Sequence, residues 1–136
     1  MINFGMIGCG SAAEIRGGLG INLSKKANLK AVSDIDIDLM NSYADKHDII
    51  DRFSSAYDLI QNPEIHAVYI AVPNVYHHPF TIAATKAGKH VLCEKPFGIS
   101  VEENISMIES ANNNNVLLSV SYYRRFYESV QFAKKL

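Results

Sequence analysis

Short apolar runs alternate along the chain with longer segments in which apolar residues recur at helical spacing. This alternation is typical of βαβ units arranged around a parallel sheet. The runs predict six strands, at residues 2–7, 29–33, around 52–53, 66–72, 90–93 and 116–120. The segments between them predict helices that end near residue 26 and residue 60, and helices over 36–47, 78–87 and 100–111. We therefore expect an α/β fold with a doubly wound, mostly parallel sheet of six strands and crossover helices.

The signals at helix ends and inside helices are uneven. Ser100 and Glu103 have the spacing of a capping box, which supports the start of the helix over 100–111. Gly17, Gly18 and Gly20 each lower the helix propensity of the segment that follows the first strand. We therefore expect that first helix to be weakly specified.

Size and composition favour one ordinary globular domain. The chain has 136 residues, and its 13 basic and 14 acidic side chains give a net charge of −1. This balance gives no electrostatic reason to expect nucleic acid or a membrane surface as a partner. Two cysteines are too few for a disulfide framework, and neither a signal peptide nor a spanning apolar run is visible. We expect a cytoplasmic protein with reduced thiols.

A glycine-bearing turn follows the first predicted strand. Its six residues fit the pattern G-x-G-x-x-A, and all are expected to contact a dinucleotide: Gly8, Cys9, Gly10, Ser11, Ala12 and Ala13. The first glycine permits the tight turn, the second lets the backbone approach a pyrophosphate, and the small Ala13 lets helix and strand pack closely. The helix N-terminus would then offer N–H groups to the phosphates. Alone the motif is weak, because a tight turn without a ligand has the same residues.

Asp34 adds context to this turn. It ends the second predicted strand, where a carboxylate can accept hydrogen bonds from the adenosine ribose hydroxyls. A carboxylate there also repels a 2′-phosphate, so the sequence predicts NAD as the cofactor rather than NADP. The neighbouring Ile35 is expected in the same contact. The alternative is that Asp34 caps the following helix, a role open also to Asp36 and Asp38.

Three further segments carry a family resemblance: V-P-N-V-Y-H at residues 72–77, A-G-K-H-V-L-C-E-K-P at 87–96 and Y-R-R-F at 123–126. Together with I-G-C-G at 7–10, they make the chain resemble the glucose–fructose oxidoreductase and inositol dehydrogenase family (Gfo/Idh/MocA). The resemblance extends over essentially the whole chain, and the run ending in E-K-P is its most specific part. It implies an NAD(P)-binding Rossmann fold.

The resemblance assigns roles to the segment after the fourth strand. In the family this segment lies along the cofactor, which implies cofactor contacts for Pro73, Asn74 and His77, with Asn74 near the nicotinamide. The adjoining Ala71 and Val72 are expected to contact the cofactor as well.

The resemblance also implies that Glu94 contacts a cofactor ribose, that Lys95 lies beside the nicotinamide and the substrate hydroxyl, and that Arg124 lies near the cofactor. Lys95 has independent support, because it follows a buried strand at the carboxyl edge of the sheet, where ligands bind. Its ammonium can stabilise a developing alkoxide, which makes Lys95 the candidate catalytic residue. The alternative is a surface lysine paired with Glu94.

The histidines and cysteines do not suggest other chemistry. His77 and His78 are adjacent and point in different directions, and no further ligands of suitable spacing accompany them, so no metal site is expected. Cys93 lacks a neighbouring group that would activate it, and we interpret it as buried packing.

We expect residues 1–121 to form the NAD(P)-binding domain and residues 122–136 to begin the connection to a substrate domain absent from this chain. A helix is predicted over 127–136, and this terminal segment would expose Phe126, Val130 and Phe132, which need a partner surface. The parent protein is then expected to be an NAD-dependent dehydrogenase of a sugar, polyol or related alcohol and a homo-oligomer, and the chain alone is expected to be inactive. The alternative is a natural single-domain NAD(P)-binding sensor or interaction module.

Overall fold

The sheet has the strand order of a doubly wound fold. The computed structural model describes all 136 residues and contains one six-stranded sheet in the order β3-β2-β1-β4-β5-β6, with every neighbouring pair parallel. The predicted α/β class and six strands are confirmed, and the sheet is parallel throughout. The strands are β1 Ile2–Ile7, β2 Ala27–Ser33, β3 Asp51–Phe53, β4 Ala67–Ile70, β5 His90–Cys93 and β6 Leu118–Val120. The order reverses between β1 and β4, and a crevice forms at such a point.

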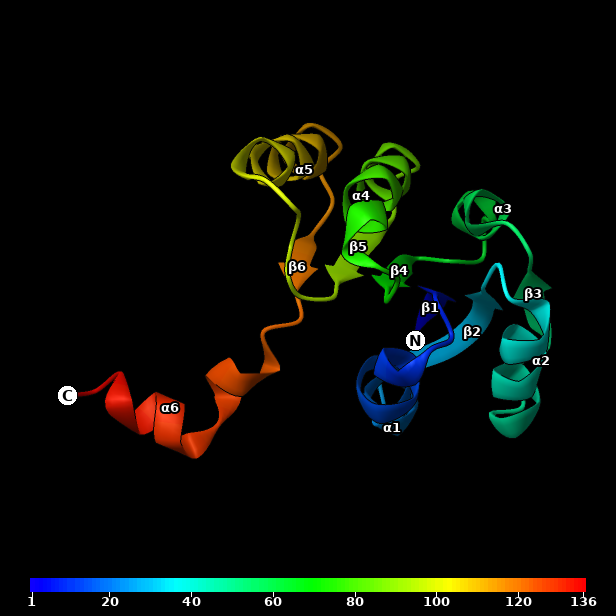
Figure 1. Ribbon diagram of the computed structural model, residues 1–136, viewed down its shortest axis with the longest axis horizontal. Coiled ribbons are helices and arrows are strands. Elements are labelled where there is room, and N and C mark those ends of the chain that lie inside the picture. Colours follow the sequence, from blue (N-terminus) through cyan, green and yellow to red (C-terminus); the bar gives the residue numbers. More distant parts are fainter.

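Helices cover both faces of this sheet (Figure 1). The elements are η1 Ala13–Gly17, α1 Gly18–Leu23, α2 Ile37–Lys46, α3 Ala56–Gln61, η2 Asn74–Tyr76, α4 His77–Lys86 and α5 Val101–Asn113. Figure 1 shows α1 and α2 on one face and α3, α4 and α5 on the other. Along the fully buried β4, Tyr69 packs in the core under α1 and α2, whereas Val68 and Ile70 pack in the opposite core. No helix has the length and apolar character needed to cross a membrane.

Two of the three glycines of the first helix, Gly17 and Gly18, have a packing reason. A Cβ on Gly17 would lie 2.1 Å from the Tyr69 ring, and one on Gly18 would lie 2.0 Å from the Tyr43 hydroxyl oxygen. The helix therefore passes over two buried tyrosine rings at a distance that only glycine allows. The segment Ala13–Gly17 is a π-helical stretch, and the helix ends at Leu23, earlier than predicted.

Two strands are shorter than their apolar runs predict. β4 ends at Ile70 instead of residue 72, and β6 begins at Leu118 instead of residue 116. The capping prediction at α5 holds, because the Ser100 hydroxyl accepts from the Glu103 backbone N–H at 3.2 Å. The Glu103 carboxylate accepts from the backbone N–H of Ile99 at 3.0 Å. Both side chains thus fix the start of the helix.

Residues 122–136 leave the body of the molecule as an arm (Figure 1). The arm contains η3 Tyr123–Phe126 and α6 Glu128–Ala133, so the helix predicted over 127–136 is shorter. Phe126 is 73% exposed and Phe132 is 65% exposed. The apolar side chains of the arm are therefore uncovered in this chain.

Candidate functional site

The turn after β1 contains two glycines with different constraints. Gly8 has φ +96°, and a Cβ there would lie 2.4 Å from the carbonyl oxygen of Ala71. The backbone N–H of Gly8 donates to Ser33 O at 2.8 Å. A Cβ on Gly10, by contrast, would meet nothing within 4 Å. The protein itself therefore requires glycine at position 8, whereas glycine at position 10 only leaves space above the backbone.

Asp34 faces this turn. Its carboxylate accepts from the backbone N–H of Cys9 at 2.7 Å and from that of Asp36 at 3.0 Å. The helix cap is Asp36, whose carboxylate accepts from the backbone N–H of Leu39 at 3.0 Å. The alternative that Asp34 caps α2 is therefore wrong, and its carboxylate lies at the glycine turn.

A groove of about 650 Å³ runs along the carboxyl edge of β1, β2 and β4. Seven of the predicted cofactor contacts line it: Gly8, Gly10, Asp34, Ile35, Ala71, Val72 and Pro73. The open space over Gly10 and the carboxylate of Asp34 suit a ligand with a phosphate bridge and hydroxyl groups. The residues present thus fit a dinucleotide.

Sequence reasoning missed the aromatic end of this groove. Tyr57, Tyr76 and Phe80 line it, and the Phe80 ring lies 5.6 Å from the Tyr57 ring and 6.0 Å from the Tyr76 ring, centroid to centroid. Such rings offer flat apolar surface to a planar base. The three residues come from α3, η2 and α4, and no motif connects them.

Nine predicted contacts do not line the groove, and five of these belong to the glycine turn, the helix after it and η2. Cys9 and Ala13 are buried, and Ser11 and Ala12 lie in the first turn of the helix behind the glycine turn. Asn74 begins η2 beside the groove.

His77 is fully buried, and its two ring nitrogens have backbone carbonyl oxygens as their hydrogen-bond partners. Its Nδ1 lies 2.8 Å from Pro96 O and its Nε2 lies 3.0 Å from Val72 O. Its ring connects the segment after β4 to the segment after β5. His77 therefore fixes the loops that carry Val72 and Lys95.

Glu94 is also buried. Its carboxylate accepts from the Tyr69 hydroxyl at 2.8 Å and from the Lys95 backbone N–H at 3.3 Å, and it lies 3.8 Å from the Arg16 guanidinium. Burial and the hydrogen bond to Glu94 raise the pKa of Tyr69, so this phenol stays protonated. The side chain of Lys95 makes no ion pair with Glu94, so the alternative of a surface lysine paired with Glu94 is wrong.

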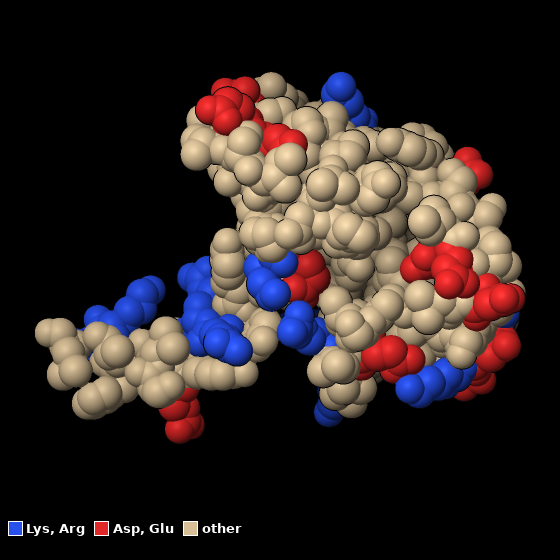
Figure 2. All heavy atoms as spheres, viewed as in Figure 1, with Lys and Arg blue, Asp and Glu red and all other residues tan.

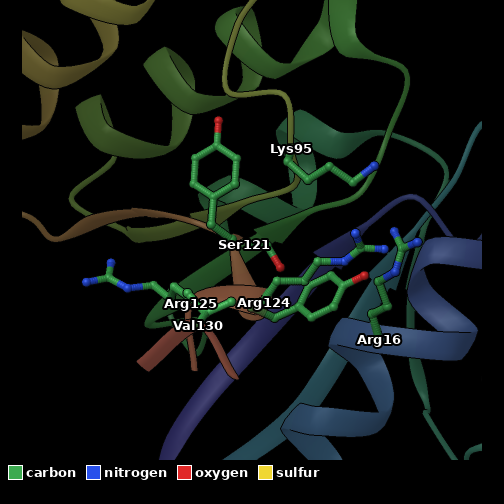
Figure 3. Close-up of a pocket in the computed structure, with 8 residues that line it drawn as sticks. Arg16, Lys95, Ser121, Arg124, Arg125 and Val130 are labelled. Atoms are coloured by element: carbon green, nitrogen blue, oxygen red, sulfur yellow. The ribbon is translucent and has the colours of Figure 1, made fainter. Parts of the chain in front are cut away.

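Lys95 and Arg124 line a second pocket of about 490 Å³ (Figure 3). Arg16, which the sequence analysis missed, and Ser121 also line it. The pocket shares no lining residue with the groove. The structure therefore brings the predicted contacts together in two groups, one at the glycine turn and one around Lys95.

The cysteines are unreactive in this setting. Mainly through burial, the pKa of each of the two thiols, Cys9 and Cys93, is raised to about 12. Both thiols are therefore protonated at neutral pH, in agreement with the interpretation of Cys93 as packing. No group of three or more histidine, cysteine or acidic side chains lies close enough together to hold a metal ion.

The strand order, the glycine turn at the point where that order reverses, and the carboxylate after β2 define the dinucleotide-binding class of α/β proteins. Residues 2–122 match the family described as "Oxidoreductase family, NAD-binding Rossmann fold" (GFO_IDH_MocA), and the chain belongs to this family. The predicted resemblance is confirmed.

Relatives and solved structures agree with this assignment. The chain is 36% identical over 124 residues to Oxidoreductase P35 of Formosa agariphila, a match that covers 91% of the chain and 39% of that protein. It is 30% identical over 125 residues to myo-inositol 2-dehydrogenase of Thermotoga maritima, with 92% and 37% covered. The crystal structure of scyllo-inositol dehydrogenase from Lactobacillus casei with NAD(H) and scyllo-inositol superposes with a TM-score of 0.91 at 26% identity, covering 100% of the chain and 40% of that structure. The chain thus spans about two fifths of the length of these relatives.

Proposed function

We propose that this chain binds a nicotinamide dinucleotide, NAD in preference to NADP, as the cofactor-binding part of a dehydrogenase that acts on a sugar, polyol or related alcohol. The observation that carries this proposal is the glycine turn, where open space over Gly10 lies beside the carboxylate of Asp34. Family membership and the dehydrogenase relatives favour this function over a non-catalytic sensor.

The groove and the pocket around Lys95 have different proposed roles. Gly8, Gly10 and Asp34 line the groove, where the glycine backbone would approach the diphosphate and Asp34 would accept hydrogen bonds from the adenosine ribose. When bound, the nicotinamide would supply the hydride acceptor or donor for the alcohol carbon. Lys95 would order the reacting oxygen and stabilise negative charge on it, and a residue outside this chain would move the proton. The contacts of Asn74 and Glu94 with the cofactor, and a position of Arg124 near it, belong to the same proposal.

The preference for NAD follows from the charge of Asp34. A 2′-phosphate would lie against a carboxylate that is already held in place by two backbone N–H groups. A ribose hydroxyl that donates to this charged acceptor contributes about 1.5–3 kcal/mol, or roughly 10- to 150-fold in affinity.

Parallel calorimetric titrations of the chain with NAD and NADP test this proposal. NAD is expected to bind at least tenfold more tightly than NADP. An Asp34→Asn variant should lose most of this preference, because a neutral amide neither repels the 2′-phosphate nor accepts as strongly. Failure of both dinucleotides to bind the folded chain would refute the proposal.

Asp36→Asn is the matched control. It removes one negative charge two residues away and keeps a good helix cap, since asparagine caps as well as aspartate. This variant should retain the preference for NAD. Equal loss of preference in both variants would mean that general charge, and not the position of Asp34, selects the cofactor.

The whole-protein assignments extend the same proposal. We infer that residues 1–121 form the cofactor domain and that residues 122–136 begin the connection to a substrate domain, as the uncovered Phe126 and Phe132 of the arm suggest. The parent protein would be a cytoplasmic homo-oligomer that uses a small-molecule substrate and binds neither nucleic acid nor a membrane.

A further inference from the structure

Three cationic side chains converge in the pocket around Lys95. Figure 3 shows Arg16, Lys95 and Arg124 extending toward the same part of it, although they come from η1, from the segment after β5 and from η3. Arg125 also lines the pocket, but its side chain extends to the opposite side, over the Phe126 ring. Figure 2 shows blue side chains gathered where the arm meets the body of the molecule.

These charges are only partly neutralised within the chain. No acidic residue lines the pocket. The nearest carboxylate is the buried Glu94, which lies 3.8 Å from the Arg16 guanidinium and already accepts from Tyr69 and from a backbone N–H. The Arg16 guanidinium is instead held over the Tyr123 ring, 5.6 Å from its centroid. One buried carboxylate against three cations leaves an excess of positive charge.

The cofactor does not account for this excess. Its diphosphate fits the turn at Gly8 and Gly10, which lines the other groove, and the two cavities share no residue. An oxidised nicotinamide ring is itself positively charged, so its approach to Lys95 adds to the repulsion. A neutral polyol would supply hydroxyl groups but no compensating charge.

We propose that the pocket formed by Arg16, Lys95 and Arg124 binds an oxyanion group of the substrate, a carboxylate or a phosphate carried by a sugar or polyol. This inference rests on the proposed function and narrows its substrate class to acidic sugars. Guanidinium groups are suited to this task because their paired N–H donors match the geometry of carboxylate and phosphate oxygens. Arg16 and Arg124 hold the anion, and Lys95 lies beside the substrate hydroxyl.

The test is a titration of the isotopically labelled chain, followed by the backbone amide signals of residues 121–125 in NMR spectra at low salt. D-Gluconate is compared with D-glucitol, which replaces the carboxylate by a neutral hydroxymethyl group, and D-glucose 6-phosphate is compared with D-glucose. At least one acidic ligand is expected to bind tenfold or more tightly than its neutral counterpart, and this comparison identifies carboxylate or phosphate as the preferred group. The inference is overturned if neither acidic ligand exceeds its counterpart, or if inorganic phosphate alone binds as tightly as glucose 6-phosphate.

Single substitutions distinguish binding by specific arginines from attraction by the overall positive charge of the pocket. Arg16→Gln and Arg124→Gln should each weaken binding of the acidic ligand about tenfold, Arg16→Lys should weaken it less, and Arg125→Gln should leave it nearly unchanged. Amide spectra of each variant show whether the fold is kept. An equal loss in Arg125→Gln and Arg16→Gln would overturn the inference.

Repeating the titration with saturating NAD distinguishes this inference from the proposed function. Retained or tighter binding of the acidic ligand supports a substrate site, whereas its loss assigns the cations to the cofactor's diphosphate. If NAD itself fails to bind, the proposed function fails, while the comparison of acidic with neutral ligands still decides the anion site.

Discussion

Replacing Gly10 with alanine should weaken dinucleotide binding without changing the stability of the fold. A Cβ at this position meets no atom within 4 Å, and the backbone of Gly10 has no positive φ. Substitutions on such open surface usually change the unfolding free energy by less than about 0.5 kcal/mol. The added methyl group occupies the space through which the diphosphate must approach the turn. Loss of one charge-assisted hydrogen bond there corresponds to about 1.5–3 kcal/mol, or roughly 10- to 150-fold in Kd.

Gly8→Ala gives the opposite result and serves as the comparison. Its φ of +96° disfavours alanine, and the new Cβ would lie 2.4 Å from the carbonyl oxygen of Ala71. Backbone strain of about 1–3 kcal/mol and overpacking of about 1–3 kcal/mol add to roughly 2–6 kcal/mol. For a chain of this size, that loss corresponds to a decrease in Tm of about 6 °C or more.

Thermal denaturation and calorimetric titration with NAD check both variants on the same samples. Gly10→Ala should keep the Tm of the unsubstituted chain and lose affinity for NAD, whereas Gly8→Ala should show a lower Tm. Unchanged affinity for NAD in Gly10→Ala would show that no cofactor passes over this residue. A decrease in Tm as large as that of Gly8→Ala would show that the steric reasoning is wrong.

Three further predictions concern the tyrosines under the first helix. In urea denaturation, Tyr69→Phe should destabilise the fold by about 1–3 kcal/mol, because it removes the hydrogen bond to the buried Glu94. Tyr43→Phe should be neutral or stabilising, because the Tyr43 hydroxyl has no hydrogen-bond partner. A larger loss of stability in Tyr43→Phe than in Tyr69→Phe would contradict this. Burial raises the pKa of Tyr43 to about 12 and also raises the pKa of Tyr69. Above pH 10 the folded state therefore keeps its phenolic protons while the unfolded state releases them, so the stability of the fold should decrease as the pH rises from about 10. A Tm that is constant up to pH 12 would refute this. Gly17→Ala should lower the Tm, because the new Cβ would lie 2.1 Å from the Tyr69 ring. Gly20→Ala places its Cβ in open space and should stabilise the fold by about 0.5–1 kcal/mol. Equal Tm values for the two variants would exclude the steric explanation.

The sequence predicted those elements whose signals are local. β5 has the predicted bounds because its apolar run is short and bounded by polar residues and a proline. β1 also has its predicted bounds, since the glycine turn ends it. The glycine turn and Asp34 could be found because their spacing along the chain is fixed by the βαβ unit itself.

Features that depend on distant contacts could not be predicted. Gly17 appears unfavourable for a helix until the Tyr69 ring, which comes from β4, is placed beside it. β4 ends at Ile70, and the two residues that follow it, Ala71 and Val72, line the groove. Arg16 has no motif, and it reaches the pocket only because the first helix and the arm are neighbours of Lys95 in space.

The hydrogen bonds of Asp34 have a consequence for changing the cofactor. The carboxylate that we propose to disfavour a 2′-phosphate also holds the backbone of the glycine turn through Cys9 and the start of the next helix through Asp36. A change of preference to NADP by substitution at this one position would therefore also loosen the glycine turn, so a gain in selectivity would be accompanied by a loss in affinity. An engineered or natural switch of cofactor in this domain needs a second substitution that supplies a new acceptor for the Cys9 N–H.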